Sequence, residues 1–322
     1  MDATTLRQLY YQMQRIRMVE ERIAEIYQEQ EMRCPVHLCS GQEAVAVGVC
    51  ATLNRDDYVM GGHRSHGHYL AKGGSLKGLM AELYGKVTGC CKGKGGSMHL
   101  IDLAAGFLGA APIVGSTIPI AVGAAFGSVM RGDERITVVF FGEGTTEEGV
   151  FHESVNFAAL KKLPVVFVCE NNLYSVYSPL SVRQPEGREV FWLAKGHGVE
   201  SYQADGNNVM EVYRLAERAV RKARGGEGPT FLEFKTYRWR EHCGPHYDND
   251  LGYRSEEEFQ EWKRLCPVQT LRERLLKDKI LCNQDIEAMV RELEAEIEGA
   301  IAFAKESPFP ERQLIIEHVY AS

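Results

Sequence analysis

The stretch F-F-G-E-G-T-T-E-E-G, residues 140–149, joins an apolar run to a helical pattern. The run at 136–141 predicts a buried strand, and a second such run lies at 165–169. Thr145 and Glu148 have the spacing of a capping box, so we expect a helix to begin near Thr145. One face of that helix carries Val150, Phe151, Ser154, Val155, Ala158 and Ala159. A strand, a helix and a strand form a βαβ unit, which predicts an α/β fold with a parallel sheet.

Periodicity also predicts elements on both sides of this unit. There is no internal repeat and no clear linker, so we expect residues 1–322 to form one α/β domain with helical extensions at about 1–30 and 256–306. In chain order the further predictions are a long helix at 6–27, strands at 200–204 and 231–237, a helix capped by Asn208, and a helical tail through Ile286–Ile301.

Two other segments are expected to be functional or mobile loops. Residues 238–256 are polar and interrupted by glycine and proline. Residues 61–117 are dense in glycine and carry the basic side chains His63, Arg64, His66, His68, Lys92 and Lys94.

Composition excludes several classes of protein. The net charge of −7 argues against a general nucleic-acid surface. No apolar run approaches the roughly 18–20 residues of a membrane span, and the N-terminus lacks the pattern of a targeting segment. Nine cysteines without a C-x-x-C spacing suit reduced thiols, so we expect a cytoplasmic protein. Cys90 and Cys91 are adjacent and make a poor zinc pair, so we interpret them as core or loop residues.

Oxygen ligands follow the two predicted strands of the central unit. Glu143 lies between two glycines after the first strand, and Asn171-Asn172 follow the second. Ligands bind beyond the carboxyl ends of parallel strands, and carboxylate and amide oxygens suit Mg²⁺. Gly144 would let the backbone approach a phosphate at the helix N-terminus. The pattern therefore predicts a metal ion that holds a diphosphate.

Other interpretations of the glycine pair are weaker. A plain turn with a capping acid would explain Gly142-Glu143-Gly144 alone, but not the paired asparagines at the next strand end. The dinucleotide fingerprint G-x-G-x-x-G fails because the next glycine is Gly149, and no Walker lysine follows.

With these residues identified, the chain resembles the alpha subunits of thiamine-diphosphate-dependent 2-oxo acid dehydrogenases of the pyruvate, acetoin and branched-chain type. The resemblance covers nearly the whole chain and implies a thiamine-diphosphate-binding fold, a mostly parallel sheet with helices on both faces. The motifs that carry it are His37–Ala44, His63–Gly67, Gly89–His99, Ile113–Gly115, Gly142–Asn172 and Thr236–Arg238.

The resemblance implies a cofactor site made of thiamine diphosphate and Mg²⁺. Glu143 and Asn172, with the Tyr174 carbonyl, would bind the metal; the acid is more often Asp, but Glu occurs in branched-chain members. Gly144 and Thr145 would face the diphosphate. The remaining implied cofactor contacts are Arg64, which would neutralise the diphosphate, Ile113 and Val114, which would contact the aminopyrimidine, and His63, which replaces the usual tyrosine.

The resemblance also implies catalytic histidines. His37 would sit near the 2-oxo acid, and His242 would act from a mobile active-site loop that orders when cofactor binds. His66 and His99 would hold loops. Cys243 stands where animal enzymes have a regulatory serine, so phosphorylation there is not expected.

Such a chain would supply only half of an active site. The glutamate that activates the aminopyrimidine would come from a beta subunit in an α₂β₂ assembly, and a lipoyl acyltransferase would accept the acyl group. The expected substrate is a small 2-oxo acid, with pyruvate favoured. An acetoin dehydrogenase or a carboligase that passes a two-carbon unit to an aldehyde or sugar stays open, because the loop at 240–249 departs from the common pyruvate pattern. A binding module with a degenerate cofactor site is the weakest alternative.

Overall fold

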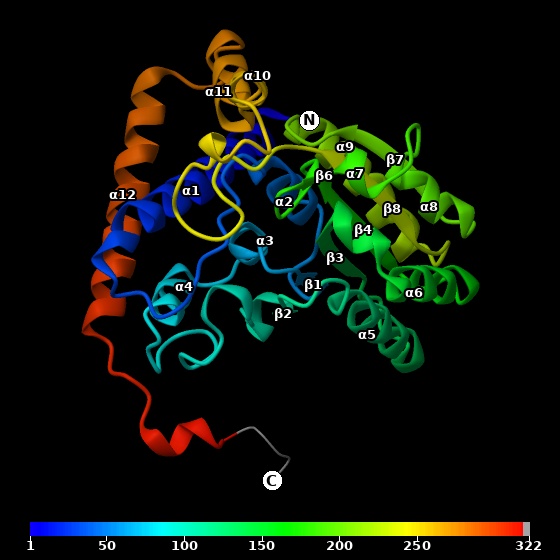
Figure 1. Cartoon of the computed structure of the whole chain (residues 1–322), viewed down its shortest axis with the longest axis horizontal. Helices are drawn as coiled ribbons and strands as arrows, with labels where there is room; N and C mark the ends of the chain where they lie inside the picture. Colours follow the sequence, from blue (N-terminus) through cyan, green and yellow to red (C-terminus); the bar gives the residue numbers. More distant parts are fainter. Residues whose placement is uncertain (318–322) are drawn as a thin grey trace.

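A six-stranded parallel sheet forms the centre of the protein, seen here in a computed structural model that describes residues 1–317 (Figure 1). All five strand pairings are parallel, and the order across the sheet is β2-β1-β3-β4-β8-β7. This confirms the α/β fold class. The strands are β1 (Tyr58–Gly61), β2 (Phe107–Ala110), β3 (Thr137–Gly142), β4 (Val165–Asn171), β7 (Glu200–Asp205) and β8 (Thr230–Lys235).

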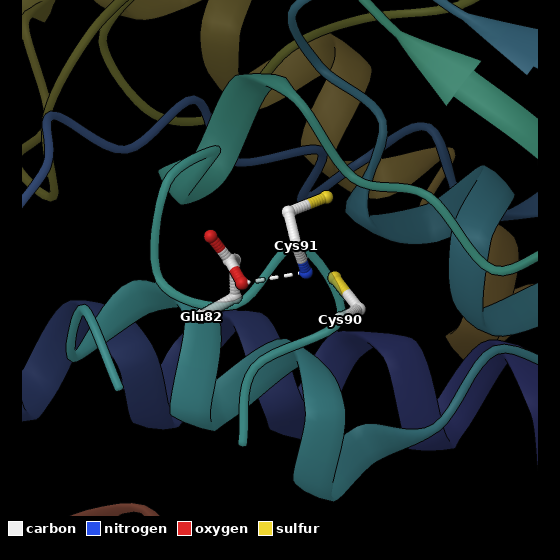
Figure 2. A group of neighbouring side chains, drawn as sticks. All are labelled: Glu82, Cys90 and Cys91. Atoms are coloured by element: carbon white, nitrogen blue, oxygen red, sulfur yellow. Dashed lines mark hydrogen bonds between the residues drawn. The ribbon is translucent and has the colours of Figure 1, made fainter. Parts of the chain in front are cut away.

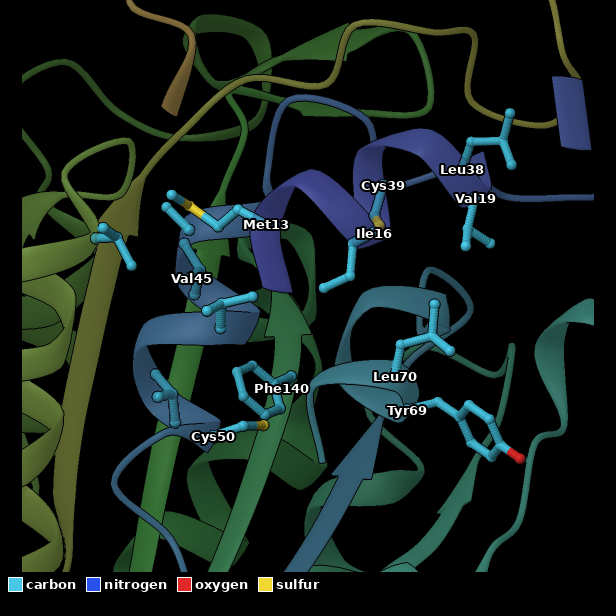
Figure 3. Packing of buried hydrophobic residues seen from close by; sticks show 14 of the residues in the cluster. Met13, Ile16, Val19, Leu38, Cys39, Val45, Cys50, Tyr69, Leu70 and Phe140 are labelled. Carbon is cyan, nitrogen blue, oxygen red and sulfur yellow. The ribbon is translucent and has the colours of Figure 1, made fainter. Parts of the chain in front are cut away.

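Helices cover both faces of the sheet because successive strand residues point to opposite sides. Phe140 and Val138 of β3 belong to a core with α1 (Ala3–Ile26), α2 (Glu43–Cys50) and α9 (Val209–Arg224), and Figure 3 shows Phe140 below Met13 and Ile16 of α1. Val139 and Phe141 belong to a second core on the other face. Its helices are α5 (Thr117–Arg131), α6 (Gly149–Leu160) and α8 (Val190–Gly196).

Long helices form the outer edge of the molecule, as the terminal patterns predict. The C-terminal helices are α10 (Glu256–Arg264), α11 (Pro267–Lys277) and α12 (Asn283–Glu306). In Figure 1, α12 crosses α1, and the two are joined by the ion pair of Arg15 with Glu296 at 2.5 Å. No helix within residues 1–317 is long and apolar enough to cross a membrane.

Residues 61–117 contain more regular structure than a long loop. They include α3 (His66–Ala71), α4 (Leu76–Leu83), two short 3-10 turns and β2, so the expectation of a continuous loop is wrong. These elements are short, and glycine and histidine interrupt their apolar periodicity. Helix α5, which follows directly, was also not predicted from the sequence.

The turn after β3 differs from the predicted capping box. Residues Glu143–Glu147 form a 3-10 helix, and α6 begins only at Gly149. Its N-cap, Glu148, makes no capping bond through its side chain. The Thr146 hydroxyl donates to the Glu143 carbonyl at 2.7 Å, which closes a tighter turn than an α-helix start would allow.

The polar segment 238–256 is fixed by charged side chains. Arg254 is buried and donates to the carbonyls of Arg238 and Trp239, at 2.6 and 3.0 Å, and it pairs with buried Asp248. Buried hydrogen bonds therefore take the place of the apolar burial that the composition lacks. Mobility of this segment stays a prediction.

Candidate active site

The predicted metal ligands meet at the carboxyl ends of β3 and β4. Gly142 pairs with Glu170 in the parallel register, so Glu143 and Asn172 follow at neighbouring strand ends. Both are buried and line one pocket. The pocket also contains the predicted residues His37, His63, Arg64, Ile113, Val114, Gly144, Thr145, Tyr174 and His242.

The side chain of Glu143 is almost completely buried, because only 1% of the residue surface is exposed to solvent. Its Oε1 lies 2.5 Å from Nη2 of Arg183, which comes from α7 (Leu180–Arg183). Burial raises the pKa of Glu143, although Arg183 acts in the opposite direction. A buried carboxylate is stabilised by a cation beside it, and here the guanidinium of Arg183 provides one.

The surroundings of Glu143 offer further oxygen atoms and little room for side chains. Oδ1 of Asn172 accepts from the Tyr174 amide at 3.3 Å, and its Nδ2 donates to Gln42 at 3.2 Å. A Cβ at Gly144 would lie 2.9 Å from Oγ of Ser175. A side chain at this position would have to displace Ser175, so glycine keeps the backbone accessible, as expected for backbone that approaches a phosphate. The residues present fit a metal that carries a diphosphate.

Three histidines from distant segments meet across the pocket. The ring centroids of His37 and His63 are 5.0 Å apart, and each lies 5.2 Å from the ring of His242. Burial, followed by the charge of Arg64, lowers their pKa values to about 3 for His37, about 2 for His63 and about 3 for His242. The three rings are therefore neutral at physiological pH.

Arg64 makes contacts that the sequence did not indicate. It is buried, and it donates to the carbonyls of Leu38 at 2.5 Å and His242 at 3.1 Å. Burial and the nearby charge of Arg238 lower the pKa of Arg64 to about 9. Arg64 thus joins the histidine loop to the pocket wall.

His66 holds a loop against the pocket, as the resemblance implies. Its Nδ1 lies 2.7 Å from Oε1 of Glu20, and its Nε2 lies 2.8 Å from Oγ of Ser97. The same Ser97 oxygen accepts from the His37 amide at 3.3 Å. His99 contacts the Gly95 carbonyl at 2.9 Å. The Gly-rich segment is therefore connected to the backbone of His37.

The two adjacent cysteines lie beside Glu82, where Figure 2 shows the three side chains. Their ligand atoms lie within 4.8 Å of one another, an arrangement that the sequence did not predict. The carboxylate of Glu82 already accepts four backbone amides, those of Cys91, Gly93, Gly95 and Gly96, at 2.7–3.1 Å. It therefore organises the Gly-rich loop and needs no metal for its charge.

Several residues of the site were not predicted from the sequence. Ser175 lines the pocket and Arg183 contacts Glu143, yet both lie in a segment without a recognisable pattern. Gln42 also lines the pocket, 130 positions from its partner Asn172. The ring of His68 stacks on Phe140 and contacts Glu170 at 3.0 Å. The only available signal was their position beside recognised motifs.

Comparison with known proteins identifies the family. A model of the family described as Dehydrogenase E1 component matches residues 11–313. The chain belongs to this family. Dehydrogenase E1 components depend on thiamine diphosphate, with a divalent metal such as Mg²⁺. The chain is thus the alpha subunit of a thiamine-diphosphate-dependent 2-oxo acid dehydrogenase, which oxidatively decarboxylates its substrate.

Similar E1 sequences come from several kinds of organism. The alpha subunit of acetoin:2,6-dichlorophenolindophenol oxidoreductase from Bacillus subtilis is 39% identical, and the alignment covers 98% of this chain and 93% of the relative. The alpha subunit of the pyruvate dehydrogenase E1 component from Porphyra purpurea is 37% identical, and the alignment covers 97% of this chain and 92% of that subunit. The corresponding subunit from Rickettsia felis is 34% identical, and the alignment covers 95% of this chain and 92% of that subunit. E1 alpha subunits pair with beta subunits.

Proposed function

We propose that Glu143 and Asn172, with the Tyr174 carbonyl, hold Mg²⁺ at the ends of β3 and β4. The meeting of Glu143 and Asn172 carries this proposal, because it brings a buried carboxylate and an amide oxygen, both ligands that suit Mg²⁺, into one pocket at adjoining strand ends. Gly144, Thr145, Arg64 and His63 would face the diphosphate, and Ile113 and Val114 the aminopyrimidine. When bound there, thiamine diphosphate would supply the carbanion and the electron sink that decarboxylation of a 2-oxo acid requires.

The histidine cluster would handle the substrate. His37 and His242 present neutral imidazoles to the pocket, where each can donate and accept hydrogen bonds. A bound diphosphate is anionic and would raise their pKa values toward the range that proton transfer needs. We assign them the orientation of the 2-oxo acid and proton transfer at its oxygen. Polar rings offer poor contact to a branched aliphatic group, which favours a small substrate such as pyruvate.

A beta subunit would complete the site in an α₂β₂ assembly. Ile113 and Val114 are large apolar residues on the pocket rim, yet 72% and 47% of their surfaces are exposed. Further large apolar residues are exposed on α5 and α6, namely Ile120, Val129, Met130, Phe157 and Leu160. Exposed apolar side chains, where they gather, are typical of a protein interface. A lipoyl acyltransferase would then accept the acyl group.

The nine free cysteines support a reducing compartment, and we propose the cytoplasm.

A second candidate is cleavage of acetoin or ligation of a two-carbon unit. One observation favours it: the similarity to the alpha subunit of the Bacillus subtilis acetoin oxidoreductase.

Substrate turnover decides between these functions. The alpha chain purified with its beta subunit would be given pyruvate, longer and branched 2-oxo acids, and acetoin, with an artificial electron acceptor. We expect release of CO₂ and acceptor reduction, fastest with pyruvate. Acetaldehyde release from acetoin without decarboxylation of any 2-oxo acid would overturn the preferred function and support the second.

A further inference from the structure

Arg183 enters the cofactor site from a segment that follows the asparagine pair. It ends the short helix α7, and its Nε donates to the Ser178 carbonyl at 3.1 Å. Its guanidinium pairs with Glu143 through Nη2 at 2.5 Å and with Glu147 through Nη1. The side chain is only 11% exposed, so this cation is largely enclosed beside Glu143.

The guanidinium takes up Oε1, one of the two Glu143 oxygens that a metal could use. Mg²⁺ at about 2.1 Å from that oxygen would stand close to the guanidinium, so the two cations would repel and compete for the carboxylate. Arg183 also reaches the corner predicted to face the diphosphate. Its Nη1 lies 3.6 Å from where a Cβ of Gly144 would be, and Ser175 of the same segment closes the other side.

We propose that Arg183 is an ion-exchange residue: it neutralises Glu143 until the metal binds, then leaves the carboxylate and binds the diphosphate. This inference rests on the proposed function of Glu143 and Gly144. Until a metal binds, the ion pair with Arg183 keeps the buried carboxylate partnered by a cation. When Mg²⁺ replaces the guanidinium at Glu143, the released guanidinium lies beside the diphosphate. A guanidinium pairs with a phosphate through two parallel hydrogen bonds.

The exchange makes two predictions of opposite sign for Arg183→Gln. Without the guanidinium, a metal ion alone no longer competes for Glu143, so it should bind more tightly. The diphosphate loses a cationic partner, so thiamine diphosphate should bind more weakly when Mg²⁺ is saturating. A residue that merely stabilises the segment would change neither affinity in this pattern.

The first measurement uses Mn²⁺ alone as the probe, with the complete assembly of alpha and beta subunits. Free Mn²⁺ is followed by its electron paramagnetic resonance signal in wild type, Arg183→Gln and Arg183→Lys. The control is Arg188→Gln, which removes an exposed arginine from the same segment. Arg183→Gln should bind Mn²⁺ about tenfold more tightly, the effect of removing roughly 1.4 kcal/mol of competition. Arg183→Lys and the control should match wild type.

The second measurement titrates thiamine diphosphate at saturating Mg²⁺ by calorimetry. Arg183→Gln should lose about tenfold in affinity. Arg183→Lys, which keeps the charge, should recover most of it, and it keeps the test valid if the glutamine variant folds poorly. Unchanged Mn²⁺ affinity in Arg183→Gln, or unchanged cofactor affinity in it, would overturn the exchange. Failure of the wild type to bind cofactor would instead overturn the proposed function. The Mn²⁺ affinities of Arg183→Gln and wild type would still show whether Arg183 competes with a metal for Glu143.

Discussion

His37, His63 and His242 show how burial sets the chemistry of single residues. Each ring is removed from water and lies near the charge of Arg64, and its pKa is lowered to between about 2 and about 3. The anionic diphosphate would oppose part of this effect. Neutral imidazoles at the substrate end are therefore a property of the folded chain before the cofactor arrives.

These shifts predict a pH dependence of stability. An unfolded histidine has a pKa near 6.5, whereas the folded rings stay neutral down to about 3. Below pH 6.5 the unfolded chain therefore binds protons that the folded chain does not, and the free energy of unfolding falls as the pH drops toward 3. Each ring contributes on the order of 1 kcal/mol of this fall between about pH 6.5 and 5.5.

Urea unfolding of the cofactor-free protein at about pH 7 and 5.5 tests this dependence. His63→Asn should lose less stability on acidification than wild type, because one titrating ring is gone. His246→Asn, at an exposed position, should behave as wild type. An equal loss in His63→Asn and wild type would contradict the neutral cluster.

Residue roles that depend on local sequence could be predicted, and those that depend on distant partners could not. Glu143 and Asn172 follow apolar runs, and parallel strands bring their ends together, so their meeting follows from the pattern. The pairing of Arg183 with Glu143 joins positions 40 apart through a loop whose course no periodicity fixes. His63 was assigned to the cofactor site by resemblance, and its place beside His37 emerged only from the structure.

At the scale of elements, the segment that carries His242 is attached to the body of the protein at the histidine and two residues after it. The Gly244 amide donates to the Val36 carbonyl at 2.8 Å, and Arg64 binds the His242 carbonyl. These contacts hold the imidazole at the pocket. His242 therefore has the position of a group that acts in turnover.

His242→Ala should lower turnover more than cofactor affinity. A positioned acid–base group contributes roughly 10²–10⁴-fold, and the variant should lose activity on this scale. Steady-state kinetics with the beta subunit at saturating cofactor measures it, with His246→Ala as the control on the same segment. Wild-type turnover in His242→Ala would exclude His242 from catalysis.

The Gly-rich loop at 91–96 depends on one carboxylate from α4. Glu82→Gln replaces an acceptor oxygen with a donor, so amides such as those of Gly95 and Gly96 would lose their partner. We expect a loss of about 3 kcal/mol in unfolding free energy, because buried donors would be left unsatisfied. Urea unfolding measures the loss, with exposed Glu294→Gln of α12 as the control. Equal stability of the two variants would show that Glu82 does not organise this loop.

Elements with long, regular patterns were predictable from the sequence. The unit β3–α6–β4, the first helix and the helical tail follow their apolar periodicity. The short helices α3 and α4 do not stand out, because tertiary contacts stabilise them more than their own pattern does. The predicted capping box failed because Thr146 closes a 3-10 turn instead.

The whole molecule presents a cofactor pocket that is open on an apolar side. Exposed Ile113 and Val114 adjoin the outer face of α5, so an alpha chain alone leaves a surface that a partner would cover. We predict that the alpha chain alone binds thiamine diphosphate weakly and does not decarboxylate 2-oxo acids, whereas adding the beta subunit restores both. Single-turnover release of CO₂ with and without the partner tests this. Full activity of the isolated chain would overturn the need for a second subunit.

The central claim is that Glu143 holds the metal through which the cofactor binds. Calorimetric titration of thiamine diphosphate, with and without Mg²⁺, into the assembly of alpha and beta subunits tests it most directly. Glu143→Gln preserves the shape of the side chain and removes its charge, while Glu148→Gln changes an exposed carboxylate nearby. We predict that Glu143→Gln loses Mg²⁺-dependent cofactor binding with its fold intact, and that Glu148→Gln binds as wild type does. Wild-type, Mg²⁺-dependent affinity in Glu143→Gln would contradict the assignment.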